Sequence, residues 1–294
     1  MPAWRAARVS LLTAAVLCQV GCFAPAGNGS APAGNGSAAV GSGRSGTPRA
    51  SGPQPSAEAN SAHPSARVSG GTAHPRGRRY PLHTGIVATT FWVGEIFDPS
   101  SPNGSQVIST YDAHWMRDYG GCDGIVTKRV CETERRVTAN GFFPARMTPR
   151  QNPFYLDLPF DDVNDPAAFS QRARVIPWAN DPGYAGHAHD PAFSYMKNRW
   201  VKITRDGRAC YGQIEDAGPG DYDDYKYVFG TRNRRPANRL YNGAGLDVSP
   251  ALTGCLRFTE LNGDDDRVNW QFVDAVNVPR GPWTRRVTTQ GVSE

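Results

Sequence analysis

Two acidic residues end short apolar runs, where a rigid β-scaffold could hold a carboxyl group for proton transfer. Asp216 is followed by Ala-Gly-Pro, a sequence that favours a sharp reversal of the backbone. Asp247 lies between Leu246 and Val248, whose side chains would face a core while its own points the other way. Such a carboxyl suits general acid or base catalysis. The alternative is that each acid caps a turn by accepting backbone N–H groups.

The N-terminal residues predict an export signal. Arg5 and Arg8 precede the apolar run 9–17, which is too short to span a bilayer. Gly21-Cys22 then resembles the cleavage site of bacterial lipoproteins, which implies lipidation of Cys22. Gln19 stands where such sites usually carry leucine, so plain secretion is the alternative. We therefore expect a signal over residues 1–22.

Composition divides the rest of the chain into a tether, a domain and a tail. Residues 23–80 are rich in Gly, Ser, Ala and Pro and nearly lack large apolar side chains, which predicts a flexible tether. Aromatic and branched residues recur over residues 81–289, a length of about two hundred residues that suits one core. Residues 290–294 are expected to form a tail.

Four cysteines lie in the predicted domain, and an even number in an exported domain predicts two disulfides. Three pairings are open. We favour Cys122–Cys131, which closes a short loop, and Cys210–Cys255, which would join two core strands.

Strand signals outnumber helix signals in the domain, so the predicted class is mainly β, with a barrel favoured over a sandwich. Asp206-Gly207 predicts a hairpin turn. Two long loops are expected over residues 152–166 and 180–191. Strands are expected over residues 85–94, 200–204, 209–215, 226–229 and 268–273, and short helices over 166–174 and 250–255.

Charge and polar clusters limit the classes of partner. The formal net charge is +5, but the tether supplies part of it, and no basic helix or nucleic-acid motif appears. We expect no nucleic-acid partner and attraction to an anionic wall or membrane surface. The polar segments 187–190 and 262–266 are interpreted as loops rather than metal sites. No cofactor motif is present.

Five segments together resemble the rare lipoprotein A family, a group of double-psi β-barrels, and in part the expansins. They are Ala88–Gly94, Thr138–Gly141, Trp200–Arg208, Ile214–Pro219 and Leu246–Ala251. The resemblance implies a six-stranded double-psi β-barrel with long loop insertions, a few short helices and a polysaccharide groove across one face.

Relatives in this superfamily include lytic transglycosylases, barrel endoglucanases and expansins, which loosen walls without hydrolysis. The resemblance implies that Asp247 is the general acid that protonates the leaving glycosidic oxygen. This chain departs from the lipoprotein family by carrying Phe142-Phe143 after Thr138–Gly141, where an acid is common. It also has Val93 near the place of the second acid of the endoglucanases.

The substitutes for that second acid are Glu95, Asp112 and Asp118, and we favour Asp112 as base or stabiliser because its neighbours resemble a groove. Asp216 would shape the rim. Expected contacts to sugar rings are Tyr111, Trp115, Trp178 and Tyr222.

The expected function is cleavage of a cell-wall polysaccharide, peptidoglycan or β-glucan, by an exported monomer that uses no metal or cofactor and meets membranes only through a lipid anchor. The alternative is an expansin-like module that binds glycan and cleaves nothing. A secreted defence or inhibitor barrel has no specific support in the sequence.

Overall fold

The structure is a computed structural model and describes residues 78–102, 104–261, 263 and 265–293. The expected export signal, the lipidation residue Cys22 and the expected tether as far as residue 77 lie outside the described residues. Within the described residues, no helix has the length and apolarity needed to cross a bilayer.

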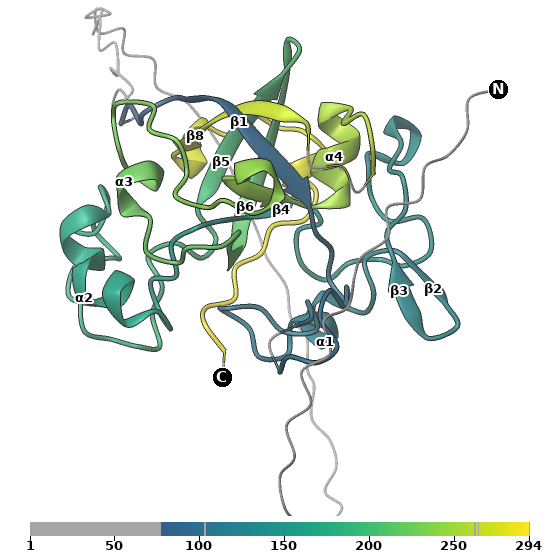
Figure 1. Ribbon diagram of the computed structural model, residues 1–294, viewed down its shortest axis with the longest axis horizontal. Coiled ribbons are helices and arrows are strands. Elements are labelled where there is room, and N and C mark those ends of the chain that lie inside the picture. Colours follow the sequence, from purple (N-terminus) through teal and green to yellow (C-terminus); the bar gives the residue numbers. More distant parts are fainter. Residues whose placement is uncertain (1–77, 103, 262, 264, 294) are drawn as a thin grey trace, which may run out of the picture. The chain divides into compact units, whose positions relative to one another are not determined.

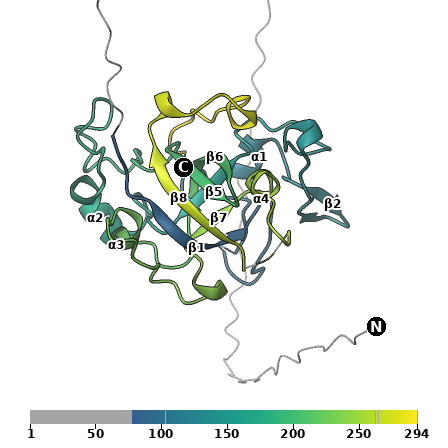
Figure 2. The ribbon, with the colours of Figure 1, turned by 90° about the horizontal axis from the view of Figure 1, so that it is seen from above.

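Six strands close into a barrel in the spatial order β1–β7–β4–β6–β5–β8 (Figures 1 and 2). Neighbours β1/β7 and β4/β6 run parallel, and the other neighbours run antiparallel. The mainly β class and the six-stranded barrel expected from the sequence are confirmed. The barrel strands are β1 (His83–Thr90), β4 (Tyr155–Leu158), β5 (Trp200–Arg205), β6 (Arg208–Ala217), β7 (Leu246–Val248) and β8 (Arg267–Val273).

The period-two pattern of the strands places their apolar residues in the core. In β8, Val268, Trp270 and Phe272 are buried and the residues between them are more exposed. Strands β5 and β6 form the expected hairpin, in which Asp206 and Gly207 have φ angles of 48° and 74°. Left-handed backbone at both positions is what a two-residue hairpin turn requires.

Both expected disulfides are confirmed. Cys122 is bonded to Cys131, and Cys210 is bonded to Cys255. The second bond differs from the expectation in what it joins, because Cys255 lies on helix α4 (Pro250–Leu256) and Cys210 on β6. Ser249 caps that helix by accepting a hydrogen bond from Leu252 N at 3.3 Å.

Two local predictions are wrong. Residues 226–229 form no strand; α3 (Tyr225–Val228) is a short helix whose first turn is capped by Asp224, which accepts from Tyr227 N. The expected loop 152–166 contains the barrel strand β4, because Asn and Pro residues at the ends of this segment obscure its strand pattern in the sequence.

The helix expected over residues 166–174 is confirmed as α2 (Pro166–Val175), with Asp165 as its cap.

A long insertion between β1 and β4 carries α1 (Trp115–Tyr119) and a hairpin of β2 (Ile125–Thr127) and β3 (Val130–Glu132), which projects from the barrel in Figure 1. Short 3-10 turns occupy residues 138–140, 241–243, 275–277 and 282–284.

The buried carboxylate of Asp123 fixes this insertion against the barrel. It accepts hydrogen bonds from Tyr119 Oη at 2.6 Å, Tyr155 Oη at 2.8 Å and Arg136 Nη2 at 2.8 Å. Tyr155 begins β4 and in turn accepts a hydrogen bond from Val93 N at 3.0 Å. A buried carboxylate with three donors, one of them cationic, has the partners that its burial requires.

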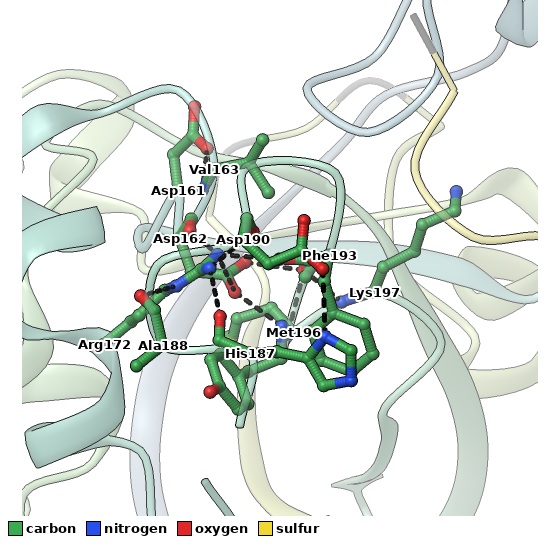
Figure 3. A network of polar contacts seen from close by, with 12 residues as sticks. Asp161, Asp162, Val163, Arg172, His187, Ala188, Asp190, Phe193, Met196 and Lys197 are labelled. Carbon is green, nitrogen blue, oxygen red and sulfur yellow. Dashed lines mark hydrogen bonds and ion pairs between the residues drawn. The ribbon is translucent and has the colours of Figure 1, made fainter. Parts of the chain in front are cut away.

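Helix α2 organises the other long loop through one guanidinium. Arg172 is fully buried, and its five N–H groups donate to the backbone carbonyls of residues 162, 187, 188, 190 and 193 at 2.6–3.2 Å (Figure 3). Five donors are all that a guanidinium possesses. Its charge also lies 3.8 Å from the buried carboxylate of Asp162. Arg172 therefore satisfies carbonyls that a loop of this length would otherwise leave without donors.

The polar segment 187–190 belongs to this loop. His187 Nδ1 lies 2.9 Å from Asp190 Oδ2, and the His187 ring stacks on Phe193 at 3.9 Å. Among the described residues, no three His, Cys, Asp or Glu side chains gather as a metal-binding group.

Replacing Arg172 with Met should lower the free energy of unfolding by about 3–5 kcal/mol, because the carbonyls lose their donors and Asp162 loses its ion pair. Urea unfolding followed by tryptophan fluorescence measures this change. The matched control is Arg174→Met on the same helix, since Arg174 is exposed and should change stability by less than about 0.5 kcal/mol. Equal effects of the two substitutions would contradict the role given to Arg172.

Candidate active site

Four neighbouring barrel strands each place one polar residue at the same end of the sheet. Thr89 on β1 pairs with Asp247 on β7, and Asp157 on β4 pairs with Asp216 on β6. Because β7 and β4 are also neighbours, the three acids lie on consecutive strands. Asp157 Oδ1 accepts a hydrogen bond from Asp247 N at 2.8 Å, and Thr89 Oγ1 donates to Asp247 Oδ1.

The pattern of β4 and β7 explains which way these carboxyls point. Leu156 and Leu158, like Leu246 and Val248, belong to the main hydrophobic cluster. Side chains alternate along a strand, so Asp157 and Asp247 lie on the opposite face of the barrel wall. The pairing of β4 with β6 is interrupted by one extra residue on β6, which brings Asp216 opposite Asp157.

Asp247 and Asp157 line a pocket of about 450 Å³. One wall is the turn after β6, where Gly218 packs so closely that a Cβ atom there would lie 2.8 Å from Asp157 Oδ2. The opposite wall comes from the residues after β1, including Trp92 and Glu95. Trp92 Nε1 donates to the carbonyl of Cys131 at 2.9 Å, so the Cys122–Cys131 disulfide supports this wall.

Three exposed aromatic rings stand around the pocket: Phe97 (55% exposed), Tyr222 (48%) and Tyr241 (59%). Tyr241 has a φ of 47°, a left-handed backbone conformation that is uncommon for a bulky residue. Tyr222 is held by a hydrogen bond from Asp161 N to its carbonyl at 2.8 Å. Exposed rings around a polar pocket are suited to packing against sugar rings.

Burial raises the pKa of every acid in this group, and neighbouring negative charges add to the effect for Asp157, Asp216 and Asp247. Burial raises the pKa of Asp247 to about 8, with further contributions from the charges of Glu95 and Asp216. Burial likewise raises the pKa of Asp157 well above its usual range, and the charges of Asp247 and Asp216 add to the effect. Burial raises the pKa of Glu95 to about 7 and that of Asp216 to about 6. At neutral pH, Asp247 therefore carries a proton.

The structure brings some of the expected site residues together. Asp247 and Tyr222 line the pocket. Asp216 is buried behind it, where its carboxylate accepts hydrogen bonds from Thr110 N at 2.7 Å and Ala217 N at 2.8 Å. Asp216 thus holds the end of β6 against residue 110, and its charge acts on both Asp157 and Asp247.

Asp112 lies elsewhere, which corrects its expected place beside Asp247. It is buried and does not line the pocket. Its carboxylate accepts from His114 N at 2.9 Å, Ser293 Oγ at 3.0 Å and Gln151 Nε2 at 3.3 Å. These bonds give Asp112 a structural role in holding the C-terminal segment.

The expectation that Trp115 and Trp178 lie at the surface is wrong, and Tyr111 is also fully buried. Trp115 packs against Phe91 and Tyr155. The Trp178 ring packs in the main core, and its Nε1 donates to the carbonyl of Tyr195 at 2.7 Å. Rings without solvent contact cannot stack on a polysaccharide, so Tyr111, Trp115 and Trp178 cannot make the expected contacts.

The sequence does not predict a site role for Asp157, Phe97 or Tyr241. A sequence pattern could have identified Asp157, because Leu156-Asp157-Leu158 repeats the arrangement of Leu246-Asp247-Val248, an acid between two apolar residues. The aromatic residues had none, since their loops carry no periodicity that shows where they meet the barrel.

Comparison with protein-family models and with curated proteins finds no match to this sequence.

Replacing Asp157 with Asn should stabilise the fold at pH 7 by about 0.5–2 kcal/mol. The raised pKa of Asp157 means that the native state holds a proton which the unfolded state releases above its ordinary pKa. This difference in pKa between the two states lowers the free energy of unfolding as pH rises above about 4. Below that pH both states are protonated, and the effect vanishes. Asparagine still offers an acceptor to Asp247 N.

Urea unfolding at pH 7 and pH 3 measures the effect, with Asp112→Asn as the matched control, because its three hydrogen bonds lie outside the pocket. A loss of stability in Asp157→Asn at pH 7, or the same gain at pH 3, would contradict the electrostatic account.

Proposed function

We propose that this chain is an exported double-psi β-barrel protein that cleaves glycosidic bonds in a cell-wall polysaccharide, with Asp247 as the general acid. The observation that carries the proposal is a pocket-lining carboxyl whose pKa, raised to about 8 by burial, keeps it protonated at neutral pH. A protonated acid at an accessible site is what departure of a glycosidic oxygen requires.

The neighbours of Asp247 fit this role. Thr89 Oγ1 donates to Asp247 Oδ1, which leaves Oδ2 to carry the proton that the leaving oxygen takes. Asp157 is a positioning residue, because it is buried and accepts a hydrogen bond from Asp247 N. It fixes the backbone of the acid.

Glu95 is the second carboxyl of the proposed site. It lines the same pocket, is half-buried, and its charge acts on Asp247. In a hydrolase, Glu95 would activate water or stabilise the developing positive charge of the sugar. In a lytic transglycosylase, a hydroxyl of the substrate itself attacks, and Glu95 would act on that hydroxyl.

Two other features support the setting of the proposal. The closed six-stranded barrel with mixed parallel and antiparallel pairing is compatible with the double-psi topology. The two disulfides are compatible with an oxidising compartment outside the cytoplasm.

A second candidate is an expansin-like module that binds the glycan without cleaving it. The exposed rings of Phe97, Tyr222 and Tyr241 favour this candidate as much as the first, because they supply binding surface without proton transfer. The two candidate functions differ in whether Asp247 transfers a proton to a glycosidic oxygen.

Asp247→Asn should abolish product release while leaving binding to the same glycan within about threefold, because asparagine keeps the shape of the acid but has no acidic proton to give to the leaving oxygen. Reducing-end assays and mass spectrometry on peptidoglycan and a panel of β-glucans measure release, and pull-down measures binding. In the wild type, activity should fall as pH rises through about 8, where Asp247 loses its proton.

Asp112→Asn is the control and should keep its activity, since Asp112 lies outside the pocket. Anhydro ends among the products would identify a lytic transglycosylase, and reducing ends a hydrolase. Retained glycan binding with no product from the wild type on any substrate would leave the non-catalytic module.

A further inference from the structure

The segment from α3 to the start of β7, residues 226–245, is strongly basic and is here called the basic loop. Residues 226–245 include five basic side chains and no Asp or Glu. All five are exposed, namely Lys226, Arg232, Arg234, Arg235 and Arg239. A dense group of like charges creates a positive potential that attracts anions to this face of the domain.

Three of these cations surround one hollow. Lys226, Arg232 and Arg234 line a space of about 410 Å³ together with the rings of Tyr225 and Phe229. Within residues 78–293 as described, Arg232 and Arg234 make no ion pair and no side-chain hydrogen bond. Asp224 is the acid whose charge interacts with Arg234. The Asp224 carboxylate accepts hydrogen bonds from Ala237 N at 2.7 Å and Tyr227 N at 3.3 Å instead of pairing with the guanidinium.

A second hollow of about 360 Å³ is lined by residues of the same segment and of β1, and Figure 2 shows the segment running along that strand. Arg235, Arg239 and Arg267 line it. Arg235 and Arg267 donate to the same carbonyl, that of Gly85, at 3.0 and 3.1 Å. A carbonyl orients two guanidiniums without cancelling their charge, and no described carboxylate forms an ion pair with either.

Both hollows are lined by residues that lie close in the chain to aromatic residues of the Asp247 pocket. Tyr222 lines the pocket and Tyr225 lines the first hollow. Three residues of chain reach at most about 11 Å between Cα atoms, so these two sites are close. On the other side, Tyr241 lines the pocket, and the next residue lines the second hollow. A polymer lying in the pocket is therefore within reach of the basic residues.

We propose that the basic loop binds the carboxylates of an acidic polysaccharide, one that carries uronic acid residues, whose chain also enters the Asp247 pocket. This inference rests on the proposed function for the pocket and names its substrate class. Guanidinium forks match carboxylates in two-point hydrogen bonds. The rings of Tyr225 and Phe229 beside the cations suit a sugar ring that carries such a carboxylate.

Binding of the full chain to polygalacturonate tests the proposal, in an Asp247→Asn background that prevents cleavage. Arg232→Gln with Arg234→Gln should weaken binding about tenfold at low salt, because two charge contacts are lost. The difference should shrink at high salt, where exposed charges are screened. Neutral β-glucan should bind more weakly than polygalacturonate and should not respond to the two substitutions.

The matched control is Arg208→Gln with Arg286→Gln, which removes the same charge from exposed residues that line neither hollow. It should stay within about twofold of the parent. Equal weakening in the control, unchanged binding in the loop variant, or tighter binding to duplex DNA or anionic vesicles than to polygalacturonate would overturn the proposal.

The two proposals fail in different ways. A wild type that releases no product, but whose binding to polygalacturonate depends on Arg232 and Arg234, would remove the catalytic proposal and keep this one. A wild type that cleaves neutral glucan but does not bind polygalacturonate would support the catalytic proposal and contradict the proposed binding of an acidic polysaccharide.

Discussion

A carboxyl group can be enclosed by protein only if it carries a proton or finds a partner for its charge, and this constraint governs the pocket on the barrel. Asp247, Asp157 and Asp216 lie on consecutive strands, and the described structure gives none of them a cationic partner within ion-pair distance. Their neighbours are backbone N–H groups, a threonine hydroxyl and one another. Protonation is the remaining way to lower the cost, so the pKa values rise. A group of acids that costs stability in this way is typical of a functional site rather than of a scaffold.

The rest of the domain keeps this arrangement rigid. The buried Asp123 joins the insertion after β1 to the first residue of β4, and thereby sets where Trp92 and Glu95 stand relative to the strand that carries Asp157. The disulfide between residues 122 and 131 supports the same wall. On the other side of the domain, Arg172 satisfies the carbonyls of a long loop whose aromatic residues pack against the core. Buried, hydrogen-bonded charges of this kind hold loops in one conformation, as the proposed site for proton transfer requires.

The parts of this account that the sequence predicted are those with a local signal. The apolar neighbours of Asp247 in a strand-like run predict that its carboxyl points away from the core. Asp206-Gly207 predicts a hairpin because both residues tolerate left-handed backbone. Asp157 has the same local pattern as Asp247, but adjacent Asn and Pro residues made its segment look like a loop. Glu95 is one of three candidate acids in the sequence, since nothing local shows which of them reaches Asp247. Burial of Trp115 and Trp178 follows from how insertions pack on the barrel, which is a long-range property.

The central claim is that Asp247 is protonated at neutral pH because the barrel wall and its neighbours enclose it. A pH titration of the side-chain carboxyl groups by ¹³C NMR, with Asp247→Asn used to assign the signal, tests this claim most directly. The account predicts that the Asp247 signal stays in its protonated position through pH 7 and titrates near pH 8. Replacing Glu95 with Gln should move that transition to lower pH, because a neighbouring negative charge is removed. An Asp247 signal that titrates near pH 4, as an exposed aspartate does, would contradict the claim and the general-acid role that rests on it.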